Sequence, residues 1–166
     1  TASVVTAFIV YNNSFRTELA ATFASGNVRL NEASSRLRGQ LDFYRALVNI
    51  IAQDRRMAVT LSGANTDVVE HALKNFSLTF GAWEVDLVTQ KGRIKASSHP
   101  ERDGTQISEK LITAALEHRL GYEIVQENGK RLVRFSRGVR DQDGRSVGGI
   151  VVSADLSELE FEWPVT

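Results

Sequence analysis

Residues 122–154 read YEIVQENGKRLVRFSRGVRDQDGRSVGGIVVSA and carry the clearest structural signal in the chain. Three runs rich in β-branched and aromatic residues, at 122–126, 131–139 and 146–154, are separated by Asn-Gly and Asp-Gly pairs. Such pairs are typical of tight hairpin turns, because they tolerate the positive φ angles that these turns require. The stretch therefore predicts three consecutive antiparallel strands.

A further pair of strands is predicted upstream of this stretch. The run WEVDLV at 83–88 alternates apolar and polar residues, which is the period of a half-buried strand. A turn at 90–92 leads into a second strand at 93–97. Together with the three later strands, this hairpin predicts a five-stranded antiparallel sheet.

Helices are predicted around these strands from apolar residues at helical spacing. They lie at 54–61, 65–80, 108–119 and 156–163. A polar loop at 98–106 precedes the third of them, and the last leaves the domain as an exit helix. Helices that flank an antiparallel sheet define an α+β fold. We divide the chain into a long N-terminal helix, 1–53, and a sheet-containing domain, 54–166.

The N-terminal helix is predicted to be unusually long. No proline occurs between residues 2 and 62, and apolar residues recur at alternating steps of three and four, with Ser34 at the one missing place. These residues are Leu30, Leu37, Leu41, Tyr44, Val48 and Ile51. A helix over 16–53 would be on the order of 55 Å long. One small domain cannot cover that length.

Two apolar surfaces are expected on this helix. Phe43, Leu47 and Ile50 widen the stripe near its end, which favours packing onto a sheet, whereas the narrow upstream part favours pairing with another helix. We therefore expect a homodimer through the N-terminal helix, with an ordinary helical bundle as the alternative. The apolar run at 4–11 is shorter than the ~20 residues of a membrane span. It fits either the outer end of a membrane helix or the buried start of a soluble one.

The overall composition limits the classes of partner. Twenty basic and twenty acidic residues cancel, so the charge gives no argument for nucleic acid as a partner. Cysteine is absent, which excludes disulfides, thiolate metal sites and a cysteine nucleophile.

Two segments resemble a known family. The first is QLDFYRAL at 40–47 with AQD at 52–54, and the second is SRGVRDQDGR at 136–145, followed by GIVVSADLSELE at 149–160 and by Trp163. Both resemble the PAS-like PDC/Cache sensor domain of DctB-type two-component histidine kinases, which sense dicarboxylates. In that family the segments form the first helix, the last hairpin and the exit helix, whereas 98–130 matches poorly.

This resemblance implies an extracytoplasmic sensor domain in the periplasmic part of an inner-membrane receptor. The parent would be a membrane-tethered, dimeric sensor histidine kinase that detects a small solute such as an organic acid and relays the signal across the membrane. The domain itself would not be an enzyme. A chemoreceptor, a cyclic-dinucleotide enzyme, a ligand-free interaction module and a soluble helical adaptor stay open as alternatives.

The ligand chemistry of the family does not transfer directly. The resemblance places Ser153 where dicarboxylate sensors have a lysine, and Val133 where they have a pocket tyrosine. The family's ligand loop has no counterpart between Ser97 and Gly121. Loss of a desolvated cation from a carboxylate site typically costs ~2–5 kcal/mol. A different ligand, or none, is therefore expected instead of a dicarboxylate.

The resemblance also places a pocket over one face of the sheet, under the loop that follows the second strand. The candidate ligand-binding residues are Ser97, His99 and Arg102 on that loop, with Tyr122, Arg131 and Ser153 beneath it. An arginine among apolar neighbours is suited to holding an anion. The alternative is that Arg131 follows a turn and points to solvent, and that His99 is a surface residue.

We predict no catalytic residue, cofactor or metal. His71 and His118 have no second histidine at metal-binding spacing, and no phosphate-binding glycine loop or nucleophile motif occurs. Glu84 and Asp86 share one strand face and could suggest a carboxylate pair. We expect Arg93 and Lys95, across the first hairpin, to neutralise them.

Overall fold

The structure, a computed structural model, describes residues 30–157 of the chain. The elements are α2 (Leu30–Ala52), α3 (Arg55–Leu61), α4 (Asp67–Phe80), β1 (Glu84–Thr89), β2 (Ile94–Ser97), η1 (Pro100–Arg102), α5 (Glu109–Leu116), β3 (Gly121–Glu127), β4 (Lys130–Arg140) and β5 (Ser146–Asp155). The chain divides into two units, Thr1–Arg36 and Leu37–Thr166. In the first unit, the structure describes only the start of α2. The sheet and the helices that flank it belong to the second unit.

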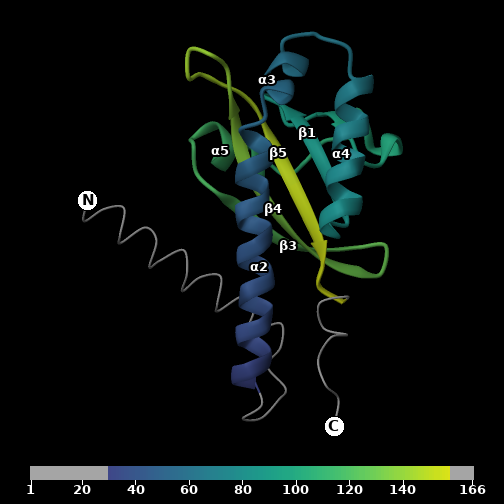
Figure 1. Ribbon diagram of the computed structural model, residues 1–166, viewed down its shortest axis with the longest axis vertical. Coiled ribbons are helices and arrows are strands. Elements are labelled where there is room, and N and C mark those ends of the chain that lie inside the picture. Colours follow the sequence, from purple (N-terminus) through teal and green to yellow (C-terminus); the bar gives the residue numbers. More distant parts are fainter. Residues whose placement is uncertain (1–29, 158–166) are drawn as a thin grey trace, which may run out of the picture. The chain divides into compact units, whose positions relative to one another are not determined.

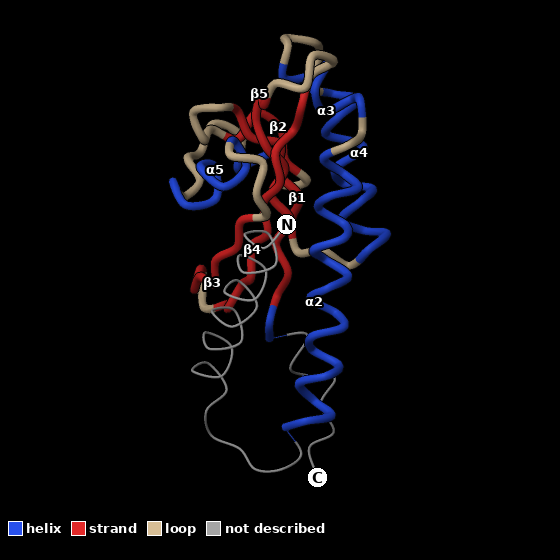
Figure 2. The backbone as a smooth tube through the Cα atoms, turned by 90° about the vertical axis from the view of Figure 1, so that its left-hand side faces the viewer, coloured by secondary structure: helices blue, strands red, loops and turns tan. Residues whose placement is uncertain are grey.

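The five strands form one antiparallel sheet in the order β2-β1-β5-β4-β3. Figures 1 and 2 show α3, α4 and the part of α2 from Leu37 onward on one face of this sheet, and α5 on the other. The predicted α+β fold is confirmed. The last strand, β5, pairs with both β1 and β4 and so lies at the centre of the sheet.

The hairpin turns form where the sequence predicted them. Asn128 and Gly129 have φ angles of 52° and 75°, and Gly144 has 79°. Asn, Asp and Gly reach these angles at low cost, so the local sequence sets the register of β3 on β4 and of β4 on β5. The predicted exit helix begins at Leu156, although the rest of 156–163 lies outside the described residues.

The apolar stripe of α2 faces inward along the whole second unit. Leu41, Val48 and Ile51 are fully buried, and Leu37 and Tyr44 nearly so. The Tyr44 hydroxyl donates a hydrogen bond to the carbonyl oxygen of Gly81 at 3.1 Å, which ties α2 to the end of α4. The predicted helix from 16 is therefore seen from Leu30 to Ala52, and its earlier part, with the run 4–11, lies outside the described residues.

The two surfaces predicted for this helix are distributed differently from our expectation. Leu37 and Leu41, expected to face a second copy, are buried within the single chain. Phe43 and Ile50, expected to pack on the sheet, are 45% and 64% exposed. Leu47, the third residue of that surface, is buried as expected. The reason is helical phase: the inward face takes the stripe through Leu41 together with Leu47, whereas Phe43 and Ile50 lie outside it.

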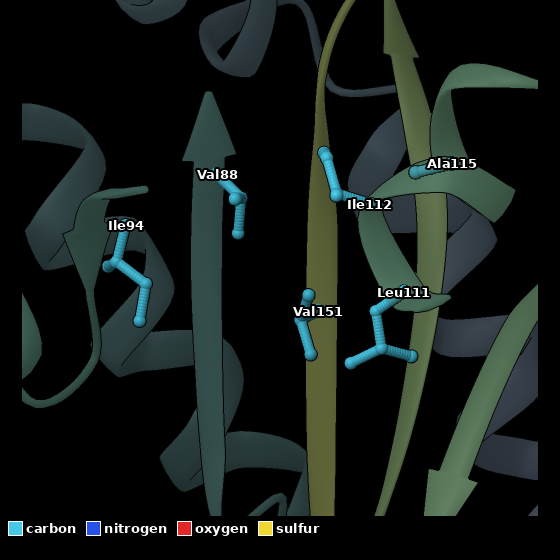
Figure 3. Close-up of a cluster of buried hydrophobic side chains, with 6 residues drawn as sticks. All are labelled: Val88, Ile94, Leu111, Ile112, Ala115 and Val151. Carbon is cyan, nitrogen blue, oxygen red and sulfur yellow. The ribbon is translucent and has the colours of Figure 1, made fainter. Parts of the chain in front are cut away.

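On the other face, α5 packs closely onto the sheet. Its hydrophobic core, drawn in Figure 3, consists of Val88, Ile94, Leu111, Ile112, Ala115 and Val151. Ser108 caps the helix by accepting a hydrogen bond from the Leu111 amide at 3.4 Å. The helix ends at Leu116, earlier than predicted, and His118 turns the chain with a positive φ of 59°.

Glycine at 138 allows this close packing. A Cβ atom on Gly138 would lie 2.3 Å from the backbone oxygen of Ala115, so the backbones of β4 and α5 would have to separate. Gly39, in contrast, lies in α2 with no atom within 4 Å of an added Cβ.

These two glycines provide a matched test of the packing. We expect Gly138→Ala to lower the free energy of unfolding by about 1–3 kcal/mol, as overpacking does. Gly39→Ala should raise it by about 0.5–1 kcal/mol, because alanine favours a helix interior. Chemical denaturation of both variants measures the difference. Equal effects of the two substitutions would contradict the close approach of α5 to β4.

Candidate functional site

Five charged side chains gather on the α5 face of the sheet. Glu84 and Asp86 lie on β1, Glu127 ends β3, Arg134 lies on β4, and Arg102 reaches them from η1. We call these five residues the charge cluster. Strand alternation puts Glu84 and Asp86 on the side of Val88, a member of the α5 core. The register then aligns Glu84 with Ser153, and Ser153 with Arg134.

The two arginines bridge the three carboxylates. The Nε atom of Arg102 is 3.2 Å from Glu84 Oε2 and 3.7 Å from Asp86 Oδ2, while its Nη1 donates to Glu127 Oε1 at 3.0 Å. The Nη2 atom of Arg134 contacts Glu84 Oε1 at 3.4 Å and also donates to Glu127 Oε2. Each arginine therefore joins β1 to the end of β3.

Two serine hydroxyls complete the polar contacts. Ser97 Oγ donates to Asp86 Oδ1 at 2.5 Å and accepts a hydrogen bond from the backbone amide of His99 at 3.0 Å. Ser153 Oγ donates to Glu84 Oε1 and accepts from Arg134 Nε, at 3.4 and 3.3 Å. The cluster is thus supported from β2 and β5 as well as from β1, β3 and β4.

The carboxylates of β1 are removed from water. Asp86 is 0% exposed and Glu84 is 2% exposed. Burial, together with the charge of Glu84, raises the pKa of Asp86 to about 7, although the Ser97 hydrogen bond and the charges of Arg102 and Arg134 oppose the rise. Partial burial would also raise the pKa of Glu127, but Arg134 and Arg102 outweigh that effect and hold it below its ordinary value. Asp86 therefore loses its proton less easily than an aspartate in water does.

The hydrogen bonding of the cluster is incomplete. Asp86 Oδ2 and Arg102 Nε are buried and have no hydrogen-bond partner among the described residues. The two atoms are 3.7 Å apart, so they attract each other as charges without forming a hydrogen bond. Buried polar atoms in this state are uncommon, and they mark positions where a ligand or water can bind.

The sequence-predicted site residues fall into two groups. Ser97, Arg102 and Ser153 come together in or beside the charge cluster. His99 lies next to it, where its amide contacts Ser97 and its Nε2 is 2.9 Å from the backbone oxygen of Trp83.

Tyr122 and Arg131 lie apart from the cluster. Tyr122 pairs with Phe135, and the ammonium group of Lys110 lies 4.7 Å from the centroid of its ring. Arg131 is exposed and alternates with Arg134, so it occupies the opposite face of the sheet from the cluster. The ligand-binding role that the resemblance implies for these two residues stays a prediction.

The expected neutralisation of Glu84 and Asp86 by Arg93 and Lys95 is wrong. The register between β1 and β2 shifts after Leu87, so that Asp86 faces Ser97 while Lys95 has no partner residue in the ladder. Arg93 instead donates to the carbonyl oxygen of Gly104 at 3.2 Å. The true partners, Arg102 and Arg134, come from parts of the sequence that the first hairpin does not contain.

Sequence reasoning missed Glu127 and Arg134 as site residues. Glu127 directly precedes the predicted Asn-Gly turn, and Arg134 lies between apolar residues of a predicted strand. A usable signal existed for Arg134, because a charged residue on a central strand usually has a charged partner when it faces a covered side of the sheet.

A separate cavity of about 500 Å³ lies between the end of α2, α3 and the β4–β5 hairpin. Its lining includes Asp54, Arg55, Arg137 and Arg140. Arg55 and Arg140 are exposed, and Asp54 is engaged by Arg56. Since the buried, incompletely bonded groups lie in the charge cluster, we take the cluster and not this cavity as the candidate site.

Neither a metal-binding cluster nor a membrane-spanning helix occurs in residues 30–157. No group of three or more His, Asp or Glu side chains there is placed to hold a metal ion. None of the helices in this range is both long and apolar enough to cross a membrane.

Solved structures of sensor domains share this fold. The chain is similar to the sensor domain of the histidine kinase DctB from V. cholerae, with a TM-score of 0.76 and 21% identity over 90% of this chain and 61% of that one. It also resembles the E. coli DcuS sensor domain, with a TM-score of 0.68 and 12% identity over 76% of this chain and 96% of that one.

A chemoreceptor domain is a third neighbour. The ligand-binding domain of Campylobacter jejuni Tlp3, in complex with 4-methylisoleucine, matches with a TM-score of 0.62 and 19% identity, over 80% of this chain and 57% of that one. No protein-family model and no curated protein matches the sequence.

These likenesses define the class of fold. The chain has the PDC/Cache sensor-domain fold, as the sequence resemblance predicted. It spans about three fifths of the V. cholerae DctB structure (61% of its length).

The buried position of Asp86 gives a testable pH dependence. Its pKa is raised from 3.8 in the unfolded chain to about 7 in the fold, so its stability contribution is complete below pH 4 and is lost as the pH rises through 7. Asp86→Asn cannot ionise. We expect the unfolding free energy of this variant, relative to wild type, to increase by on the order of 2 kcal/mol between pH 5 and pH 8.

Urea denaturation across this pH range measures the effect. Asp42→Asn, which changes a carboxyl group that is exposed on α2, serves as the control and should show no such trend. A difference between Asp86→Asn and wild type that stays constant from pH 5 to pH 8 would show that Asp86 is ionised throughout.

Proposed function

We propose that this chain is a non-catalytic sensor domain that detects a small solute at the charge cluster. The observation that carries the proposal is the burial of Glu84 and Asp86, with one unsatisfied carboxylate oxygen, on a fold shared with sensor domains. A sheet whose role was structural alone would be more stable with apolar residues there, because buried charges carry a large desolvation cost. Retaining them favours a binding role.

We further propose that the domain lies outside the cytoplasm, in a membrane-tethered sensor histidine kinase of the inner membrane. The likeness to the DctB sensor domain supports this choice of output. A chemoreceptor is the second candidate, favoured by the likeness to the Tlp3 ligand-binding domain. Fold likeness alone does not separate the two outputs, because one sensor fold serves many signalling proteins.

The central strand offers a route for the signal. Ser153 of β5 contacts Glu84 in the cluster, and two residues later Asp155 accepts hydrogen bonds from Lys130 Nζ at 3.0 Å and from the Ser157 amide at 2.8 Å. Leu156, between them, is fully buried. A ligand that shifts β5 would therefore shift the start of the exit segment. It would bias two states only through its different affinity for them.

The test of ligand sensing is a thermal-shift screen with organic acids, amino acids and small amines. A solute that binds the folded domain should raise the unfolding temperature in a saturable manner. We expect Glu84→Gln, which removes a buried charge of the cluster, to weaken this binding at least tenfold by isothermal titration calorimetry. Arg131→Ala, on the opposite face of the sheet, should leave the affinity unchanged.

The outcome also decides the sequence prediction for Arg131. Loss of binding in Arg131→Ala with retention in Glu84→Gln would move the site to the other face of the sheet. Absence of any saturable shift across the panel would support a ligand-free interaction module instead.

We also propose a homodimer through the outward face of α2. Phe43 and Ile50 are seven residues apart and exposed, and Phe43 contacts the exposed ring of Phe80 with centroids 6.0 Å apart. Residues at this spacing lie on one side of a helix and suit a helix–helix seam. Because Leu37 and Leu41 are already buried, the seam uses this face instead.

Sedimentation equilibrium of the chain tests this seam. We expect the wild type to dimerise and Phe43→Asp with Ile50→Asp to shift the chain to monomer, because both carboxylates would be buried at the interface. Val59→Asp on α3, also an exposed apolar position, is the control and should dimerise normally. A wild-type chain that remains monomeric at millimolar concentration would contradict the proposal.

A further inference from the structure

When Asp86 is ionised, the charge cluster has an excess of negative charge. Three carboxylates, Glu84, Asp86 and Glu127, face two guanidinium groups, so full ionisation leaves one negative charge uncompensated. Without Arg102 the excess would be two. A buried site of this kind repels an anionic ligand and attracts a cation.

Arg102 makes an imperfect fit to this site. Only its Nη1 hydrogen bond to Glu127 is well formed, while its buried Nε faces Glu84 and Asp86 without a hydrogen bond. Asp86 Oδ2 is likewise without a partner among the described residues. Hydrogen bonds between charged groups contribute more than neutral ones, and an unmade bond on a buried group is costly. A cationic nitrogen that is better placed could therefore form the hydrogen bonds to Glu84 and Asp86 that the Nε of Arg102 does not form.

The backbone around Arg102 allows its side chain to withdraw. The η1 turn is three residues long, and its own hydrogen bonds are local, from the Arg102 amide to the His99 oxygen at 2.9 Å and from the Asp103 amide to the Pro100 oxygen at 3.1 Å. Residues 103–106 are exposed, and the backbones of Gly104 and Thr105 are hydrogen-bonded to Ile94 of β2 at 2.9 Å each, so the movement is that of the Arg102 side chain. Arg134, in contrast, is held in the middle of β4 between two paired strands. Of the two arginines, Arg102 is the one that can leave without breaking the sheet.

We propose that Arg102 acts as a tethered internal cation that occupies the ligand site, and that the solute which displaces it carries its own guanidinium or primary ammonium group. This inference rests on the proposed sensing function and specifies the ligand class. The ligand nitrogen would take the place of the Arg102 guanidinium against Glu84 and Asp86. The freed Arg102 side chain would then turn toward solvent, while Gly104 and Thr105 keep the following backbone hydrogen-bonded to β2.

The test is chemical rescue of Arg102→Ala. Removal of the guanidinium leaves space and two excess negative charges, so methylguanidine or methylammonium should bind in a saturable manner. At ten times its dissociation constant, the cation should raise the unfolding temperature of Arg102→Ala by roughly 3–6 °C. Its affinity for Arg102→Ala should be at least tenfold higher than for wild type, because in wild type it must displace the tethered arginine.

Three controls keep the result specific. Urea at the same concentrations reports any general solvent effect, and the double variant Arg102→Ala with Asp86→Asn should lose at least tenfold in affinity for the cation. Arg102→Gln keeps the aliphatic stem without the charge and should show the same rescue if the alanine variant is too unstable to measure.

The outcomes separate this inference from the proposed function. No saturable binding of either cation to either Arg102 variant would overturn the inference. If the wild type then bound an organic acid from the screen, ligand sensing would stand with a different ligand class. Equal affinity of the cation for wild type and for Arg102→Ala would also overturn it, because no displacement would be taking place.

Discussion

Two carboxylates on β1, Glu84 and Asp86, are withdrawn from water in the middle of the sheet, and the arrangement of their neighbours follows from the need to neutralise them. An isolated buried carboxylate would cost many kcal/mol, so charge partners or protonation must compensate. The structure uses both: Arg102 and Arg134 supply positive charge, and the raised pKa of Asp86 allows it to keep a proton near neutral pH. Because the partners come from η1 and β4, this single electrostatic requirement holds together parts of the chain that are distant in sequence.

The cluster and the apolar core are two ends of the same layer. Val88 and Val151 belong to the core beneath α5 (Figure 3). Asp86 and Ser153 of the polar end lie two residues away along β1 and β5. Side chains of residues i and i+2 of a strand point to the same face, so the change from dry core to charged site takes place within one step of the strand period. The α5 core packs on β1 and β5 at one end. At the other end, the acidic side chains of β1 are contacted by the long side chains of Arg102 and Arg134.

The sequence predicted features that depend on local chemistry and missed those that depend on distant pairing. Asn128-Gly129 and Gly144 determine their turns through backbone angles, and the stripe of α2 follows from helical period, so both could be predicted. The position of β5 between β1 and β4 carries no local signal, and it is this order that brings Arg134 beside Glu84. Likewise, the shift of register after Leu87, which turns Lys95 away from Asp86, could not be inferred from alternation alone. Ser97, Arg102 and Ser153 were placed near one another through the family resemblance, not through any pattern in their own segments.

The structure changes how the serine at position 153, where the family has a lysine, is interpreted. A cation is present at this position after all, because Arg134 on the neighbouring strand reaches the Ser153 hydroxyl at 3.3 Å. However, that arginine is already engaged by Glu84 and Glu127 and so has no full charge to offer to a ligand carboxylate. Two features therefore act in the same direction. β5 carries a neutral residue at this position, and acidic residues face it from β1 and β3. Both make this position more favourable to a cation than to an anion, as the proposed ligand class requires, and β5 connects it from the centre of the sheet to the exit segment.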